Sequence, residues 1–101
     1  MQYVSTRGLA PALTFTDAMM TGLARDGGLY VPAAVPQMTH AQIADLAGRP
    51  YEAMAFRVMW PFLGGAFHED EFRRLIAAAY RGFDHPARAP LKQLGPNHFL
   101  M

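Results

Sequence analysis

The sequence predicts a small α+β domain that is mainly α, with three to four helices and a small two- or three-stranded sheet. Two stretches, residues 51–62 and 72–83, carry apolar residues at helical spacing, which favours amphipathic helices. Two short runs, residues 3–6 and 29–31, have the character of strands. The length of 101 residues, 51% of them hydrophobic and 17% charged, favours one folded domain over a disordered chain.

The first strand is expected over Tyr3–Thr6 and the second over Leu29–Val31, and we expect the two to pair. The connection between them is long enough for either strand direction, so the direction stays open. Within that connection, Thr16 is the expected N-cap of a short helix. Arg25 should lie in the last turn of this helix, and Gly27-Gly28 should end it because glycine readily takes positive φ.

A capping-box pattern marks the start of the next helix, with Thr39 at the N-cap and Gln42 three residues later. We expect a short helix over residues 40–47. Its apolar residues Ile43 and Leu46 should face inward.

Proline opens and closes the following helix. Pro50 should stand at its first position, where the missing N–H costs nothing, and Pro61 should stop or kink it near Trp60. Its expected apolar stripe is made of Tyr51, Met54, Ala55, Val58, Met59 and Phe62.

The clearest helical pattern begins with three acidic residues, Glu69, Asp70 and Glu71, which suit the positive end of a helix dipole. Arg81 should lie in the last turn, and Gly82 should follow as the C′ residue. The expected buried stripe is made of Phe72, Leu75, Ile76, Ala79, Tyr80 and Phe83.

The helical period ends after Asp84, where proline dipeptides begin. Leu91–Leu94 and His98–Met101 are expected strands, and Gly95-Pro96-Asn97 is the expected turn between them. The chain stops at Met101 inside an apolar run without a terminating signal, so we expect a truncation or a disordered boundary there.

Composition excludes several classes of function. The formal net charge is +1 and the eight arginines are scattered, so a nucleic-acid interface is not expected. The absence of cysteine excludes a disulfide scaffold or a thiolate metal site. Neither a signal peptide nor an apolar run of the roughly 18 residues needed to cross a membrane is present, so the expected location is cytoplasmic.

Three polar clusters are candidates for chemistry. His68 with the three acidic residues that follow it could suggest a metal site, but a solvated helix start is the favoured interpretation. Asp26-Gly27-Gly28 could cradle a phosphate, although a helix stop followed by a tight turn is favoured. Ser5-Thr6-Arg7-Gly8 could bind an anion, and the end of a strand with its loop is the favoured alternative.

Lys92 is the one lysine of the chain, so any Schiff base formed within it would have to use this amine. It lies between Leu91 and Gln93 without the Gly, Ser or Thr residues of a phosphate cup. We therefore interpret it as a lysine that faces solvent, without a catalytic role.

Seven methionines and seven phenylalanines are many for so short a chain. They could fill a methionine-rich core, or they could form a surface that docks on something else. The second alternative predicts an exposed apolar patch and self-association through it.

Two motifs about twenty residues apart carry a resemblance to a known family. Tyr3-Val4-Ser5-Thr6-Arg7-Gly8 and Asp26-Gly27-Gly28-Leu29-Tyr30-Val31-Pro32, with Phe15, Asp17-Ala18 and Gly22-Leu23 between them, strongly resemble the opening of threonine synthases. The order of the following segments is also similar: the Tyr51 helix ending in Pro61-Phe62, the Phe72–Tyr80 helix and the Pro90-Leu91 segment. The resemblance covers essentially the whole chain.

The resemblance implies a pyridoxal-phosphate (PLP) enzyme that converts O-phospho-L-homoserine and water to L-threonine and phosphate. Its catalytic core would be a PLP fold-type II α/β structure, similar to the β-subunit of tryptophan synthase. The Schiff-base lysine of the family lies beyond the stretch that His98–Met101 resembles. The resemblance thus implies no catalytic, cofactor-binding or metal-binding residue in this chain, which we expect to be inactive alone.

The resemblance also implies a division of the chain. Residues 1–90 would form the N-terminal domain, and residues 91–101 would begin the connection into the catalytic domain, its partner within the same chain. Ser5, Thr6 and Arg7 would support the substrate side, with Arg7 near the lobe interface and the phosphate region. The alternative is that Arg7 only pins the N-terminal strand by hydrogen bonds.

Two other functions stay open on the sequence. The chain could be a free-standing protein-interaction module derived from the same domain. It could also be an anion- or nucleotide-binding domain that uses the Gly27-Gly28 turn.

Overall fold

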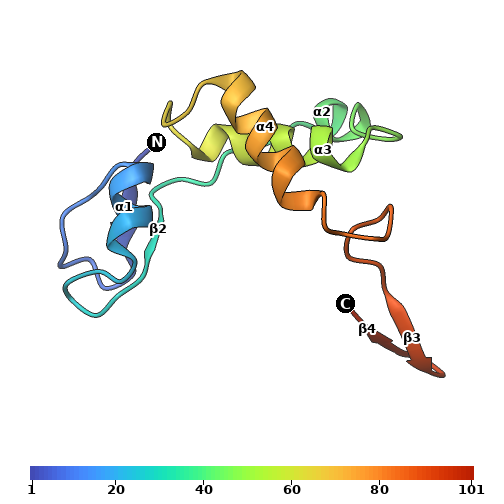
Figure 1. Ribbon diagram of the computed structural model, residues 1–101. Coiled ribbons are helices and arrows are strands. Elements are labelled where there is room, and N and C mark those ends of the chain that lie inside the picture. Colours follow the sequence, from blue (N-terminus) through green and yellow to red (C-terminus); the bar gives the residue numbers. More distant parts are fainter.

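The computed structural model describes residues 1–101 and has three parts arranged in an open arch (Figure 1). A strand–helix–strand unit comes first, a layer of helices forms the middle, and a hairpin ends the chain. The radius of gyration is 16.8 Å, whereas a compact domain of this length has about 13 Å. The chain is therefore more open than an independent globular domain of its size.

The N-terminal unit consists of β1 (Tyr3–Ser5), α1 (Phe15–Thr21) and β2 (Tyr30–Pro32). The two strands pair as predicted, and their direction, left open by the sequence, is antiparallel. Ser5 pairs with Tyr30 at one end of the ladder. The predicted pair of strands is confirmed, with bounds shifted by one residue.

The prediction for α1 is wrong at both ends. The side chain of Thr14, not Thr16, accepts the capping hydrogen bond from the Asp17 N–H, so the helix begins earlier. Gly22 takes a φ of +72° and ends it, and Arg25 lies outside the helix. Gly27-Gly28 therefore does not end a helix but belongs to a loop.

The middle layer contains α2 (His40–Ala44), α3 (Tyr51–Met59), the 3₁₀ helix η1 (Trp60–Phe62) and α4 (Glu69–Tyr80). The capping box of Thr39 and Gln42 is confirmed, with both reciprocal hydrogen bonds present. The helix it starts is shorter than predicted. Ile43 is 54% exposed, so its predicted inward position is wrong.

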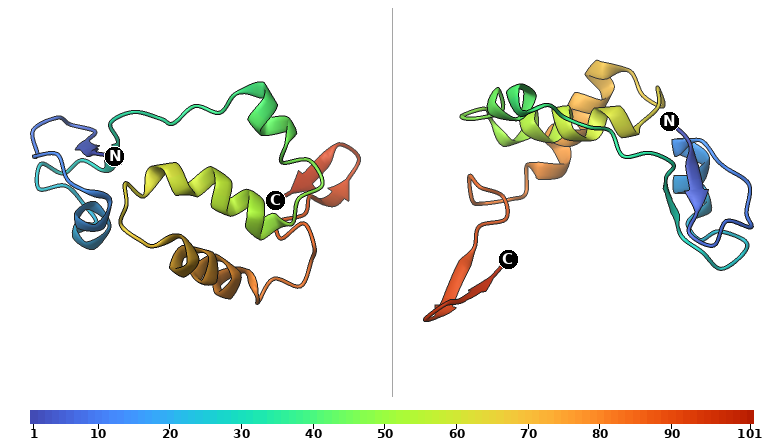
Figure 2. Two further views of the ribbon diagram at one scale, coloured as in Figure 1. Left: turned by 90° about the horizontal axis from the view of Figure 1, so that it is seen from above. Right: turned by 180° about the vertical axis from the view of Figure 1, so that it is seen from behind.

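A small aromatic core forms where α3 and α4 lie side by side (Figure 2, left). Phe56 stacks on Trp60 with ring centroids 5.0 Å apart and meets Phe72 at 6.0 Å. The buried members of this core are Phe56, Leu63, Phe72 and Ile76.

The predicted stripes of both helices are only partly correct. Val58 on α3 and Leu75 on α4 are 46% and 47% exposed, although each was predicted to face inward. Phe56, which lies outside the predicted stripe, is instead the buried residue of α3. The reason is that these two helices pack mainly on one another, so each buries a narrow face rather than a full stripe.

Proline and glycine end these helices nearly as predicted. Pro50 is the N-cap of α3 rather than its first residue, and the 3₁₀ turn at Pro61 ends that helix. Arg81 is the C-cap of α4, and Gly82 does not take the predicted positive φ.

The C-terminal hairpin is formed by β3 (Lys92–Gly95) and β4 (His98–Leu100), which pair antiparallel. The two predicted strands are confirmed, with bounds shifted by one residue. Asn97 in the turn has a φ of +59°, a conformation that asparagine tolerates better than most residues. The hairpin forms a second sheet, separate from that of β1 and β2. It stands away from the helices (Figure 1 and Figure 2, right).

An ion pair fixes the segment that leads to the hairpin. The Arg88 guanidinium donates to the Glu52 carboxylate at the start of α3 and to the main-chain carbonyl of Phe83.

No helix of the chain is long and apolar enough to cross a membrane.

Candidate functional site

The two motifs singled out in the sequence meet at the end of β1 and the start of β2. The Ser5–Tyr30 pair closes the ladder, and the Thr6 N–H donates to the carbonyl of Leu29 at 2.9 Å. The loop that enters β2 thus lies against the loop that leaves β1. Residues about twenty positions apart are brought together there.

The Asp26 carboxylate is the centre of this arrangement. It accepts hydrogen bonds from the Ser5 hydroxyl at 2.8 Å, the Gly28 N–H at 2.9 Å and the Leu9 N–H at 2.9 Å. Desolvation raises the pKa of this carboxyl, but the hydrogen bonds from Gly28, Ser5 and Leu9 outweigh it and lower the pKa below its ordinary value. The carboxylate therefore stays ionised and ties three segments together.

Thr6 and Gly28 complete the contact between the two loops. The Thr6 hydroxyl accepts a hydrogen bond from the Leu29 N–H at 3.0 Å. A Cβ at Gly28 would lie 2.3 Å from the Ser5 hydroxyl oxygen and 3.0 Å from a carboxylate oxygen of Asp26. Only glycine fits this position, because the space of a side chain is taken by the hydrogen-bonding groups.

Arg7 lies on the solvent side of this network. Its main-chain N–H donates to the Ser5 hydroxyl at 3.1 Å, and its guanidinium donates to the Asp26 main-chain carbonyl at 3.2 Å. No carboxylate is within ion-pair distance of this guanidinium. Since arginine has five N–H donors, most of its donors remain free for an anion.

The hydrogen-bond network around Asp26 stabilises the two loops and has no feature of a catalytic site. Ser5 is only 5% exposed, and its hydroxyl is occupied by Asp26 with no histidine bonded to it. A serine nucleophile requires an accessible oxygen and a base, so this role is not supported. The sequence did not reveal that Ser5 binds Asp26. One feature of the sequence could have indicated this contact: the two polar motifs directly flank the predicted pair of strands, so pairing of the strands brings them together.

A family model described as "Threonine synthase N terminus" matches residues 2–80. The chain belongs to this threonine synthase family. The resemblance seen in the two motifs is thereby confirmed, and those motifs form the hydrogen-bonded network described above.

Curated threonine synthases match nearly the whole chain. The threonine synthase of Pseudomonas aeruginosa is 48% identical over 101 residues, which is 100% of this chain and 22% of the relative. That of Schizosaccharomyces pombe is 35% identical over 95 residues, 93% of this chain and 18% of the relative. The chain therefore spans about a fifth of the length of these threonine synthases.

The fold of the chain is also that of a solved threonine synthase. The crystal structure of PLP-bound threonine synthase from Brucella melitensis matches with a TM-score of 0.89 and 49% identity. The match covers 99% of this chain and 22% of the other. The predicted α+β, mainly α fold is thus confirmed as part of a threonine synthase.

The chain contains a single lysine amine. Lys92, the one lysine, lies exposed on β3 opposite Leu100, with no phosphate cup around it. The cofactor of such an enzyme needs a lysine amine for its Schiff base. The exposed position of Lys92 agrees with the prediction of a lysine that faces solvent.

The remaining candidates are single groups rather than sites. Glu69, Asp70 and Glu71 occupy the first turn of α4 after the N-cap His68, as the favoured interpretation predicted. No three His, Asp or Glu side chains are grouped closely enough to hold a metal ion.

Proposed function

We propose that the chain is the N-terminal domain of a PLP-dependent threonine synthase. The reaction of the whole enzyme would convert O-phospho-L-homoserine and water to L-threonine and phosphate. The observation that supports this most directly is the match of essentially the whole chain to about a fifth of the P. aeruginosa and B. melitensis threonine synthases. PLP and most of the substrate contacts would belong to the other four fifths.

The proposed role of the domain is to pack against the catalytic domain of its own chain. Its open shape supports this role, since the chain has a radius of gyration of 16.8 Å and its C-terminal hairpin stands apart from the helices (Figure 1). Large apolar side chains are exposed in both end units, namely Met19, Met20, Leu23, Leu29, Leu91, Leu94, Phe99 and Leu100. Covering such a surface would stabilise the assembly by roughly 25 cal/mol for each Å² of apolar area buried.

The proposed division lies at residue 90. Residues 1–90 would form the N-terminal domain, and residues 91–101 would begin the connection to the catalytic domain. The isolated position of the β3–β4 hairpin supports this boundary (Figure 1).

Ser5, Thr6 and Arg7 are proposed to support the substrate side of the enzyme. Ser5 and Thr6 hold the two loops together, and the free N–H groups of Arg7 can interact with an anion. The alternative is that Arg7 only stabilises the loop. Its hydrogen bond to the Asp26 main-chain carbonyl supports this alternative equally well.

Arg7→Ala in the full-length enzyme separates these two roles. Support of the phosphate region predicts a higher KM or a lower kcat at unchanged stability. Simple pinning predicts a lower Tm with unchanged kinetics for the folded enzyme. Arg25→Ala, which removes an exposed arginine of the same unit, is the matched control.

The reaction itself is tested by phosphate release from O-phospho-L-homoserine, with threonine measured in parallel. The full-length protein should turn over with PLP present, and the 101-residue chain alone should not. Turnover by the isolated chain would contradict a supporting role. A full-length protein that lacks PLP absorbance and activity would favour the interaction module instead.

Two further properties are proposed for the chain on its own. Its exposed apolar side chains should drive self-association, which light scattering at increasing concentration measures. Its location is proposed to be cytoplasmic, which fractionation of cells expressing the full-length protein would test.

A further inference from the structure

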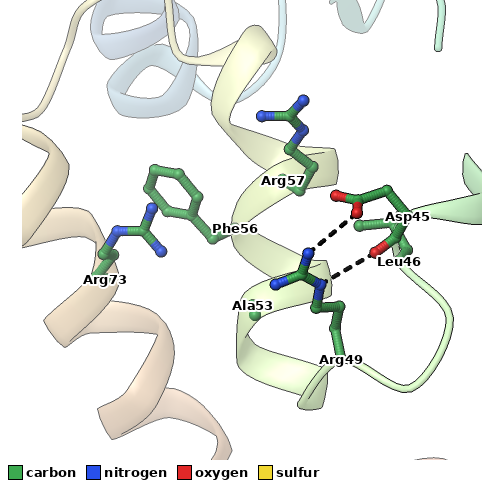
Figure 3. A pocket seen from close by; sticks show the side chains of 7 residues that line it. All are labelled: Asp45, Leu46, Arg49, Ala53, Phe56, Arg57 and Arg73. Carbon is green, nitrogen blue, oxygen red and sulfur yellow. Dashed lines mark hydrogen bonds and ion pairs between the residues drawn. The ribbon is translucent and has the colours of Figure 1, made fainter. Parts of the chain in front are cut away.

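A concave pocket of about 230 Å³ lies between the end of α2, α3 and α4 (Figure 3). Its apolar part is formed by Leu46, Ala53 and Phe56, while Arg49, Arg57, Arg73 and Asp45 supply its polar lining. Ligand pockets commonly measure roughly 300–1,000 Å³, so this one suits a small ion rather than a cofactor.

Two of the three guanidinium groups are held in place. Arg49 donates to the carbonyl and to a carboxylate oxygen of Asp45, both at 3.0 Å. Arg73 donates to Glu69 through two nitrogens, and its guanidinium carbon lies 3.6 Å from the centroid of the Phe56 ring. Each of these arginines has five N–H donors and uses two nitrogens, so donors remain on both.

Arg57 differs because it makes no hydrogen bond or ion pair within the chain. Figure 3 shows the Arg57 side chain extending from α3 away from Arg49 and away from the start of the helix. An unpaired arginine can turn toward an incoming ion without breaking an existing hydrogen bond, although its side chain loses rotamer freedom when it does so.

The balance of charge at the pocket is positive. Three guanidinium groups but only one carboxylate, that of Asp45, line the pocket, and Glu69 outside the lining pairs with Arg73. Both existing pairs are exposed i,i+4 pairs, and such pairs are weak because water screens them. An anion that accepts from several guanidinium groups at once therefore competes with weak partners. The Phe56 ring forms the apolar floor of the pocket and is 7% exposed, and the Arg73 guanidinium lies against it.

We propose that Arg49, Arg57 and Arg73 form a binding site for a small anion that carries two or more negative charges, such as a phosphate ester or a diphosphate. The planar guanidinium fork matches phosphate oxygens in pairs. All three arginines lie in the helical layer, so the site would exist whatever reaction a longer protein catalyses.

Inorganic pyrophosphate is the probe for this site. A titration of the chain at about 0.15 M ionic strength, where the Debye length is roughly 8 Å, suppresses unspecific attraction. The arginine Nε–Hε signals of Arg49, Arg57 and Arg73 should shift together and saturate at millimolar concentration or below. Failure to saturate, or shifts spread evenly over all eight arginines, would overturn the site.

Arg57→Gln should weaken pyrophosphate binding about tenfold or more, the change that one charge-assisted hydrogen bond carries. Arg57→Lys keeps the charge but not the fork, so it should restore binding only in part. Arg74→Gln removes the same charge from α4 outside the pocket, and it should change the affinity less than about twofold. Equal losses in Arg57→Gln and Arg74→Gln would contradict a defined site. Circular dichroism checks that each variant folds.

Discussion

The Ser5 hydroxyl lies 2.8 Å from each carboxylate oxygen of Asp26, a residue 21 positions further along the chain. This contact joins the end of β1 to the loop that precedes β2. With the N–H groups of Gly28 and Leu9 it surrounds the carboxylate with donors. The two motifs singled out in the sequence thus stabilise each other.

The first prediction concerns pH. The pKa of Asp26 is lowered in the folded chain, so its contribution to stability is present above the unfolded value of about 3.9 and is lost as pH falls through the folded value. Urea unfolding from pH 7 down to acid should show this loss in the original chain. Asp26→Asn should be less stable at pH 7 and should lose less on acidification.

A matched variant makes the pH result specific. Asp84→Asn removes the same charge from a residue outside the network. It should keep the acid dependence of the original chain. An identical pH profile for Asp26→Asn and the original chain would show that the carboxylate does not hold the loops.

The second prediction concerns Gly28. The φ of Gly28 is not positive, so Gly28→Ala introduces no backbone strain, but its Cβ would lie 2.3 Å from the Ser5 oxygen. Overpacking of this kind costs about 1–3 kcal/mol. Denaturant unfolding should show this loss for Gly28→Ala.

Gly82→Ala is the control for that substitution. Gly82 also lacks a positive φ, and a Cβ there would meet nothing within 4 Å. It should be neutral or stabilise by about 0.4–1 kcal/mol through the unfolded state. Equal stability of Gly28→Ala and Gly82→Ala would mean that the loops around residue 28 move apart to accommodate the added methyl group without loss of stability.

The third prediction compares two residues of α3. Phe56→Ala removes a ring that is 7% exposed and touches Trp60 and Phe72, so it should cost about 3–5 kcal/mol. Val58→Ala, which the sequence pattern placed in the buried stripe, should change stability by no more than about 0.5 kcal/mol. Thermal unfolding followed by circular dichroism measures both. A larger loss of stability for Val58→Ala than for Phe56→Ala would support the buried stripe predicted from the sequence instead.

The sequence predicted best the features that depend on neighbouring residues. The capping box of Thr39 and Gln42 needs only the local backbone, and it forms as predicted. The same holds for the hairpin around Asn97, whose turn residues determine its geometry. The Glu69–Tyr80 helix also follows from its own period and acidic start.

Features that depend on distant partners could not be predicted in the same way. Both Thr14 and Thr16 can cap a helix, and the choice depends on how the Leu13–Tyr3 contact positions the chain. The bond between Ser5 and Asp26 needs the register of β1 and β2, which no local pattern determines. The burial of Phe56 instead of Val58 likewise depends on where α4 lies.

The last prediction concerns the contact between the N-terminal unit and the helices. The Tyr3 hydroxyl donates to the Phe62 carbonyl at 2.9 Å, across 59 positions of sequence, while its ring lies 5.9 Å from that of Phe15. Burial raises the pKa of Tyr3, so the hydroxyl stays protonated and donates at neutral pH. Tyr3→Phe keeps the ring and removes one hydrogen bond, a loss of about 1 kcal/mol.

Because this bond joins two units, its loss should loosen one against the other rather than unfold either. Hydrogen exchange should become faster at β1 and in η1 and stay unchanged in the middle of α4. Tyr30→Phe is the control, since the Tyr30 hydroxyl donates to Pro11 at 3.2 Å within the N-terminal unit. Tyr30→Phe should leave exchange in η1 unaltered. If both variants speed exchange in η1 equally, the Tyr3–Phe62 bond does not couple the two units.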